Sequence, residues 1–158
     1  MKIAIAPFAA KLPTGIRNAK DYHEWPKLIE LLNAEGHEVI QLAGHNEPRL
    51  EGVAQFIQGF PLDRLEDVLR SCDTWISVDS WLPHFCATVR LKSGIVLWSQ
   101  SDPRIWGYPH NINLHKPEYL RQYQYAPWYD VPHNPNAFVA PETVMDALHG
   151  RLVQTATA

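Results

Sequence analysis

Short apolar runs alternate with amphipathic stretches along this chain. The runs at 2–6, 38–42, 74–78 and 95–98 have the length and residue content of buried strands. Between them, apolar residues recur three and four positions apart, and this spacing predicts helices. Because a helical crossover returns the chain in the same direction, the alternation predicts an α/β fold with one doubly wound parallel sheet.

Residues with known positional preferences mark the ends of the predicted helices. Pro26 suits the first turn of a first helix, and Gly36 suits the position just after its last turn. Asp63 can cap a second helix. A third helix is expected over 82–89 and a last one over 141–149, where apolar residues keep helical spacing.

Other parts of the chain give weaker signals. Residues 45–61 predict at most a short helix. Residues 101–140 form an irregular segment rich in proline and aromatic side chains, with a candidate strand at 111–114. The end of the chain, 150–158, is expected to fray. No linker divides the sequence, so residues 1–158 are expected to form a single domain.

Composition narrows the class of protein. A chain of 158 residues, 46% of them hydrophobic, suits one globular domain that buries roughly 70% of its unfolded surface. Its formal net charge of −3 argues against broad nucleic-acid binding, which needs a basic surface. No apolar run approaches the roughly 20 residues of a membrane-spanning helix, and the first residues lack the apolar stretch of a signal peptide. We therefore expect a cytoplasmic protein with no membrane span.

The residues that most often bind metals lack the spacing of a metal site. Cys72 and Cys86 fall on the apolar faces of two predicted helices, which indicates free, buried thiols. His110, His115 and His133 lie in the proline-rich segment without cysteine or helical partners at ligand spacing. We expect surface histidines and no metal.

The stretch ISVDSWLPHFCATV, residues 76–89, runs from a strand into a helix. Asp79 and Ser80 fall at the junction, and His84 lies about one turn into the helix. A helix N-terminus carries unsatisfied amides and a partial positive charge, worth up to about 2 kcal/mol to an anion. Ligands of doubly wound sheets bind beyond the carboxyl ends of the strands, so the junction predicts a phosphate site. In the alternative interpretation, Ser80 only caps the helix and Asp79 only holds the loop.

The sequence around this junction resembles the C-terminal half of the family 9 glycosyltransferases, the heptosyltransferase group. The resemblance lies in three stretches that follow in this order: LDRLEDVLRSCDTWIS, VDSWLPH and GIVLWSQSDP. In that family an Asp-Thr-Gly-x-x-His stretch holds the ADP part of ADP-heptose, and Asp79, Ser80 and His84 match it with the same spacing. Trp81 stands where the family has glycine, so we expect the diphosphate to sit differently or the ligand to differ.

Two further loops extend the resemblance. Ser99–Pro103 is similar to the family's Gly-x-Thr-x-Pro turn. The stretch IAPFAAK resembles the loop after the first strand, and the residues from Lys20 to Trp25 resemble a Lys-x-Trp-Pro segment with a longer spacing. Lys11 and Lys20 are therefore candidate phosphate contacts. The resemblance implies a crevice that holds a diphosphate, made of nine residues: Lys11, Lys20, Asp79, Ser80, His84, Ser99, Gln100, Ser101 and Asp102.

The resemblance also implies a fold and an activity. The fold is a single Rossmann-like sheet, equivalent to the C-terminal half of a GT-B glycosyltransferase. The activity is metal-independent, inverting glycosyl transfer from a nucleotide sugar similar to ADP-heptose, with no bound cofactor. Complete enzymes of the family have a second domain that supplies the base, whereas here Met1 leads directly into the donor domain's first strand. We therefore expect a separate acceptor-domain protein as partner, or a reduced acceptor site within 101–138.

Other interpretations stay open. Asp102 and Asp130 are candidate bases, although an aspartate just before proline more often starts a turn. A binding module that captures a nucleotide or nucleotide sugar without turnover is the main alternative function. A small nucleoside-processing enzyme is disfavoured because no glutamate nucleophile has a convincing setting. The eight aromatic residues between positions 101 and 138 also predict a homo-oligomer.

Overall fold

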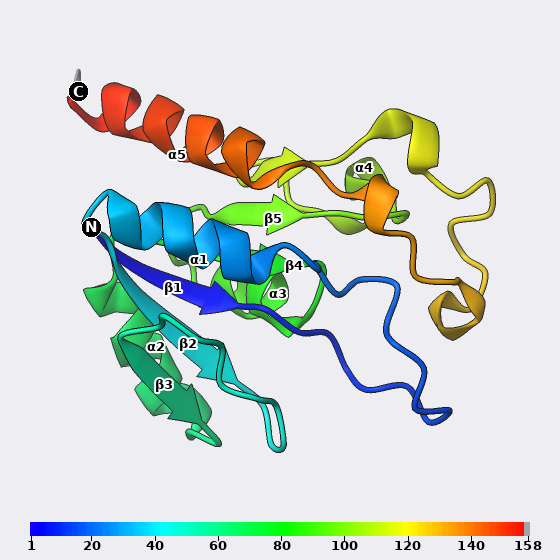
Figure 1. The fold of residues 1–158 in the computed structure, drawn as a ribbon, viewed down its shortest axis with the longest axis horizontal. Coiled ribbons are helices and arrows are strands. Elements are labelled where there is room, and N and C mark those ends of the chain that lie inside the picture. Colours follow the sequence, from blue (N-terminus) through cyan, green and yellow to red (C-terminus); the bar gives the residue numbers. More distant parts are fainter. Residues whose placement is uncertain (157–158) are drawn as a thin grey trace.

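The computed structural model describes the backbone of residues 1–156 and the side chains of 1–127 and 129–150. Its centre is a six-stranded parallel sheet with the strand order β3-β2-β1-β4-β5-β6 (Figure 1). The strands are β1 (Lys2–Ala6), β2 (Glu38–Ala43), β3 (Gln55–Gln58), β4 (Thr74–Val78), β5 (Ile95–Leu97) and β6 (Ile112–Leu114). This order is that of a Rossmann-like doubly wound sheet, which confirms the predicted fold class.

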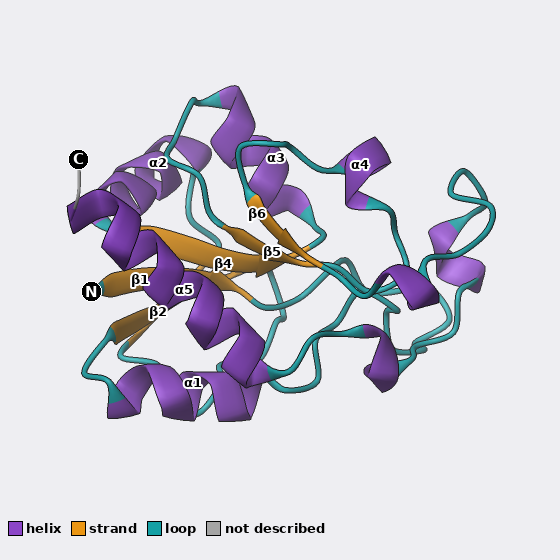
Figure 2. Ribbon diagram, turned by 90° about the horizontal axis from the view of Figure 1, so that it is seen from above, coloured by secondary structure: helices purple, strands orange, loops and turns teal. Residues whose placement is uncertain are grey.

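Helices cover both faces of the sheet. They are α1 (Trp25–Ala34), α2 (Leu62–Ser71), α3 (Trp81–Thr88), α4 (Pro103–Trp106) and α5 (Pro141–Ala156). Figure 2 shows α1 and α5 on one face and α2 and α3 on the other. No helix of the described residues is both long and apolar enough to cross a membrane.

The alternation of side chains along β1 divides the core into two halves. Ile3 and Ile5 are fully buried against the apolar side chains of α1 and α5. Ala4 and Ala6 face the opposite cluster, which α2 and α3 contribute to. Because successive residues of a strand point to opposite faces, a strand buried on both faces reads as a continuous apolar run.

Three sequence predictions differ from the structure. Residues 55–58 form the edge strand β3 rather than a short helix, and its half-exposed side chains explain the weak signal. Asp63 does not cap α2, because Pro61 holds an extended backbone there and the helix begins at Leu62. The last helix does not end at residue 149 but continues to Ala156. Residues 157 and 158 of the predicted frayed end lie outside the described residues.

The loops that follow the strands gather at the carboxyl edge of the sheet, where Figure 1 shows the longest connections. The chain leaves β1 toward α1 on one face and leaves β4 toward α3 on the other. Neighbouring connections that diverge in this way leave a crevice outside the strand ends, at the point where the strand order reverses. The loops of 7–24 and 79–80 border this crevice.

Candidate functional site

A cavity of about 300 Å³ lies at this edge of the sheet. Its wall combines residues from the loops after β1, β4 and β5 with residues of the irregular segment 101–140. The lining consists of Lys20, Asp79, His84, Ser101, Trp106, Arg121, Gln124, Tyr125, Ala126 and Pro127. Side chains that are far apart in the sequence therefore converge beside the β1–β4 crevice.

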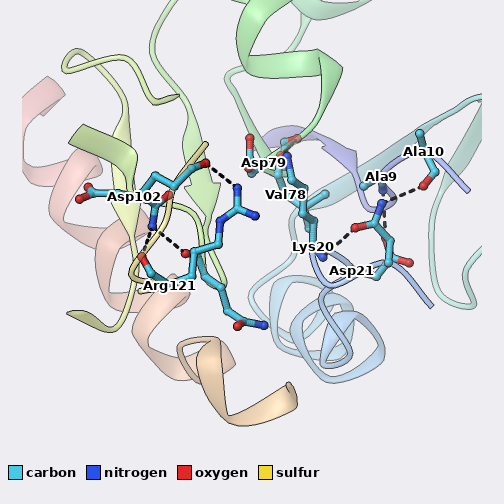
Figure 3. Close-up of polar contacts among 12 residues, drawn as sticks. Ala9, Ala10, Lys20, Asp21, Val78, Asp79, Asp102 and Arg121 are labelled. Carbon is cyan, nitrogen blue, oxygen red and sulfur yellow. Dashed lines mark hydrogen bonds and ion pairs between the residues drawn. The ribbon is translucent and has the colours of Figure 1, made fainter. Parts of the chain in front are cut away.

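An ion pair between Lys20 and Asp79 spans the crevice. Lys20 Nζ lies 2.8 Å from Asp79 Oδ2, and the two side chains are 22% and 7% exposed. Figure 3 shows the pair between the loop after β1 and the end of β4, with Asp102 and Arg121 on the other side of the site. Because little water reaches these groups, their charges interact more strongly than they would on an open surface.

The loop after β1 holds Lys20 in place through its own polar contacts. The Ala9 N–H donates to Asp21 Oδ1 at 3.0 Å, and Asn18 Nδ2 donates to the Ala10 carbonyl at 2.8 Å. Asn18 Oδ1 in turn accepts from the Lys20 N–H at 3.0 Å. Burial raises the pKa of Asp21, although the Ala9 hydrogen bond acts in the opposite direction. These contacts position the lysine before any ligand binds.

Ser80 occupies the N-cap position of α3 but does not act as a side-chain cap. Its hydroxyl makes no capping hydrogen bond, and Oγ is buried without a hydrogen-bond partner among the described residues. His84 lies exposed one turn further on, with Nδ1 3.0 Å from the Tyr108 hydroxyl. The interpretation in which the Ser80 side chain caps the helix is therefore wrong, and its hydroxyl is left buried at the helix N-terminus without a hydrogen-bond partner among the described residues.

The loop after β5 contributes buried polar residues. Ser99 and Ser101 are buried, and Asp102 caps the short helix α4 by accepting from the Arg104 N–H. Arg104 Nη2 also lies 2.7 Å from Asp102 Oδ2, and this guanidinium lowers the pKa of the Asp102 carboxyl. The carboxylate is already engaged, so Asp102 has the turn-starting role. Asp130, the other candidate base, is exposed and does not line the cavity.

The structure brings most of the nine predicted site residues together. Lys20, Asp79, His84 and Ser101 line the cavity itself. Ser99 and Gln100 line a small adjoining hollow that also includes Lys20. Ser80 and Asp102 follow Asp79 and Ser101 directly in the chain. Lys11 is placed elsewhere: its Nζ donates to the Asn46 carbonyl at 3.1 Å, beside the loop after β2.

The residues that close the cavity from the irregular segment were not among the predicted site residues. Arg121 donates through Nη1 to the Ala126 carbonyl at 3.0 Å and through Nη2 to the Gln124 carbonyl at 2.8 Å. Its Nε is buried and has no hydrogen-bond partner within the described part of the chain. Trp106 and Tyr125 complete the rim. The interleaving of basic and aromatic residues was the only available signal, because the segment has no regular periodicity.

A second hollow of about 290 Å³ lies beyond the ends of β2 and β3. No lysine, arginine, aspartate or glutamate side chain lines it, and its wall includes Ile57, Phe60, Leu62 and Trp81. Trp81 follows Ser80 directly, while Asp79 lines the first cavity. The two hollows therefore adjoin the same turn at the start of α3, and charged side chains line only the first of them.

The described residues offer no group of three histidine, cysteine, aspartate or glutamate side chains that could hold a metal ion. Cys72 and Cys86 are both free and buried. Burial raises the pKa of the Cys86 thiol to about 12, so it stays protonated and is a poor metal ligand.

The fold and site define a Rossmann-like domain with a polar ligand cavity at the point where the strand order reverses. The model of glycosyltransferase family 9 (heptosyltransferase) matches residues 2–124. The chain therefore belongs to glycosyltransferase family 9, as the sequence resemblance predicted. No curated protein sequence matches it.

Solved structures show the same fold. The chain is similar to dodecameric iron-containing heptosyltransferase TibC in complex with ADP-D-β-D-heptose, with a TM-score of 0.60 and 15% identity. It is also similar to TibC from enterotoxigenic E. coli H10407, with a TM-score of 0.56 and 16% identity. Both alignments cover 89% of this chain but only 35% and 36% of the TibC chains. This chain therefore spans about a third of the length of the structures it matches.

Proposed function

We propose that this domain binds the diphosphate of a nucleotide sugar similar to ADP-heptose and serves as the donor-binding part of a glycosyltransferase. The observation that carries the proposal is the little-exposed Lys20–Asp79 ion pair, which lies at the β1–β4 crevice and lines the cavity beside the N-terminus of α3. Anions bind favourably where backbone amides of a helix N-terminus and a cationic side chain converge.

Several groups could hold the diphosphate. Lys20 exchanges its contact with Asp79 for a phosphate oxygen, and the first amides of α3 donate to the same group. Ser80 Oγ and Arg121 Nε, which lack hydrogen-bond partners among the described residues, supply further donors. Asp79, released from Lys20, becomes free to accept a hydrogen bond from a sugar hydroxyl. Buried donors and acceptors without partners are rare, so their presence here supports a ligand.

The two hollows suggest an orientation for the nucleotide sugar. A nucleobase is flat and largely apolar on its faces, so it suits the hollow that contains Phe60 and Trp81. A sugar carries many hydroxyl groups, so it suits the cavity with Asp79 and His84. The diphosphate then bridges the two at the turn between Asp79 and Trp81.

We infer an inverting, metal-independent transfer for this site. The acceptor oxygen bonds to the anomeric carbon, the bond from that carbon to the diphosphate oxygen breaks, and the acceptor proton passes to a base. Lys20 and Arg121, together with the amides of α3, stabilise the negative charge that develops on the leaving diphosphate. The base is proposed to come from a separate acceptor-domain protein or from an acceptor site within 101–138.

One observation favours the alternative, a module that binds without turnover. The carboxylates at the cavity are both paired, Asp79 with Lys20 and Asp102 with Arg104. Within the described residues of the cavity wall Asp79 is the one carboxylate, and once released from Lys20 it is proposed to bind a sugar hydroxyl, so none is left to act as a base. The protein would then hold a nucleotide sugar without cleaving it.

Incubation with ADP-heptose and UDP-glucose, followed by denaturation and chromatography of the ligands, tests both functions. Release of ADP or UDP supports a transferase with its own acceptor site within 101–138, whereas recovery of intact, bound nucleotide sugar supports the binding module or a donor domain that needs a separate acceptor-domain protein. The Lys20→Ala variant is the control, because it should lose binding in either case. If neither these nucleotide sugars nor ADP and UDP bind at saturating concentration, both functions are refuted.

A further inference from the structure

Two aromatic side chains stand at the mouth of the polar cavity. Trp106 is the last residue of α4, and Tyr125 lies in the following irregular segment. Their ring centroids are 5.2 Å apart, and the ring planes meet at 64°. Trp106 is 39% exposed and Tyr125 is 79% exposed, so neither ring is used to fill the core. The pair instead presents apolar surface to the cavity and its opening.

A single buried amide holds the segments that carry these two rings. Gln124, which is 8% exposed, accepts a hydrogen bond from the Asp102 N–H at the start of α4. Its Nε2 donates to the carbonyl oxygens of Gln100, at 3.2 Å, and Arg121, at 2.8 Å. The Arg121 guanidinium closes the turn that contains Tyr125 by donating to the carbonyls of residues 124 and 126. These hydrogen bonds therefore position the aromatic pair.

The groups around the pair suit one class of ligand. A pyranose has a face of C–H groups and a rim of hydroxyls, and the rings lie in the same cavity wall as Asp79, His84 and Ser101. An aromatic face can cover the C–H surface while these polar groups bond the hydroxyls. The cavity, at about 300 Å³, lies at the lower end of the roughly 300–1,000 Å³ range of small-molecule sites. This size suits one monosaccharide unit better than a whole nucleotide sugar.

We propose that Trp106 and Tyr125 form the wall that receives the glycosyl group of the donor and that they determine the preference for a nucleotide sugar over the bare nucleoside diphosphate. The inference rests on the proposed function, because it requires a diphosphate at the turn beside Asp79. Gln124 is a positioning residue that fixes both rings. Aromatic side chains that are already held in place lose little conformational entropy when a ligand binds. Their contacts with the glycosyl group can therefore contribute to the preference for a nucleotide sugar over the nucleoside diphosphate.

Isothermal titration calorimetry with ADP and ADP-heptose, and in parallel with UDP and UDP-glucose, tests the proposal. Trp106→Ala and Tyr125→Ala are each expected to weaken nucleotide-sugar binding about three- to tenfold while leaving diphosphate binding within about twofold of wild type. Trp106→Phe should keep most of the preference. The matched control is Tyr123→Ala, because Tyr123 is 71% exposed and does not line the cavity.

The outcomes separate this inference from the proposed function. Equal losses for the sugar nucleotide and its diphosphate, or no loss for either, would overturn the role of the aromatic wall and leave diphosphate binding intact. A wild-type protein that binds none of the four ligands would overturn the proposed function and this inference together. Unchanged thermal unfolding of Tyr125→Ala, which alters a largely exposed residue, excludes misfolding as the cause of a lost preference.

Discussion

The Lys20–Asp79 ion pair allows a quantitative prediction of how the crevice is held together. Exposed ion pairs contribute about 0–1 kcal/mol to stability, whereas breaking a buried pair costs about 3–5 kcal/mol because one charge stays buried alone. Here the aspartate side chain is 7% exposed and the lysine 22%, so the pair lies between these limits. We expect a coupling energy of about 1–3 kcal/mol between the two residues.

The two single variants should differ because the partners differ in exposure. Lys20→Ala leaves the buried Asp79 carboxylate without its cation and is expected to lower the free energy of unfolding by about 2–4 kcal/mol. Asp79→Asn leaves a lysine that can turn toward water, so its effect should be about half as large. The difference between the variants reports the cost of the unpaired carboxylate.

Urea unfolding of wild type, both single variants and the double variant gives the coupling energy as a double-mutant cycle. Glu66 and Arg70 provide the matched control, since they form an ion pair on α2 with side chains 31% and 52% exposed. That pair should couple by only about 0.3–0.5 kcal/mol. A Lys20–Asp79 coupling no larger than the control would refute the view that this ion pair organises the crevice.

Three further predictions concern stability, pH and ligand binding. Gly94→Ala should destabilise the fold by about 1–3 kcal/mol in urea unfolding, because a Cβ there would collide with a buried indole ring; an unchanged midpoint would contradict the packing. A hydrogen bond from His149 lowers the pKa of Glu35 below its ordinary value of 4.5. This contact therefore stabilises the fold above pH 4.5, and the stabilisation is lost as the pH falls through the lower pKa of the folded state. Wild type and Glu35→Gln should therefore differ in urea unfolding at about pH 6 and converge as the pH falls below the folded pKa of Glu35, and a constant difference would refute the assignment. Lys11→Ala should leave the calorimetric affinity for ADP unchanged, whereas Lys20→Ala lowers it by about tenfold or more; equal effects would contradict the placement of the two lysines.

The central part of the fold could be predicted because its physical signal is local. Strands buried on both faces, such as β1 and β4, consist of continuous apolar residues, and their direction follows from the helical crossovers. The edge strand β3 gave no such signal, since its two central residues are half-buried and its two ends are polar and exposed. Its position depends on pairing with β2, which no local pattern encodes.

The candidate site also has a part that could be predicted from the sequence and a part that could not. Asp79 and His84 could be predicted because strand ends of a doubly wound sheet meet at one edge, whereas Lys20 was predicted from the family resemblance alone. Lys11 could not be excluded from the sequence, because the path of its loop depends on a contact with the distant Asn46 carbonyl. The remaining wall depends on hydrogen bonds of Gln124 to the loop after β5, which tertiary structure alone creates.

The part of the cavity that could be predicted from the sequence and the part that could not have different proposed functions. Of the groups proposed to hold the diphosphate, Lys20, Ser80 and the amides of α3 lie at the strand ends and the start of α3, so changes there also disturb the fold. The aromatic rings proposed to face the sugar, those of Trp106 and Tyr125, stand on α4 and on the irregular segment, which carry few core side chains. Substitutions in that part can therefore alter sugar preference at little cost in stability. Donor selection is consequently expected to depend on residues 101–127 and diphosphate binding on the strand ends.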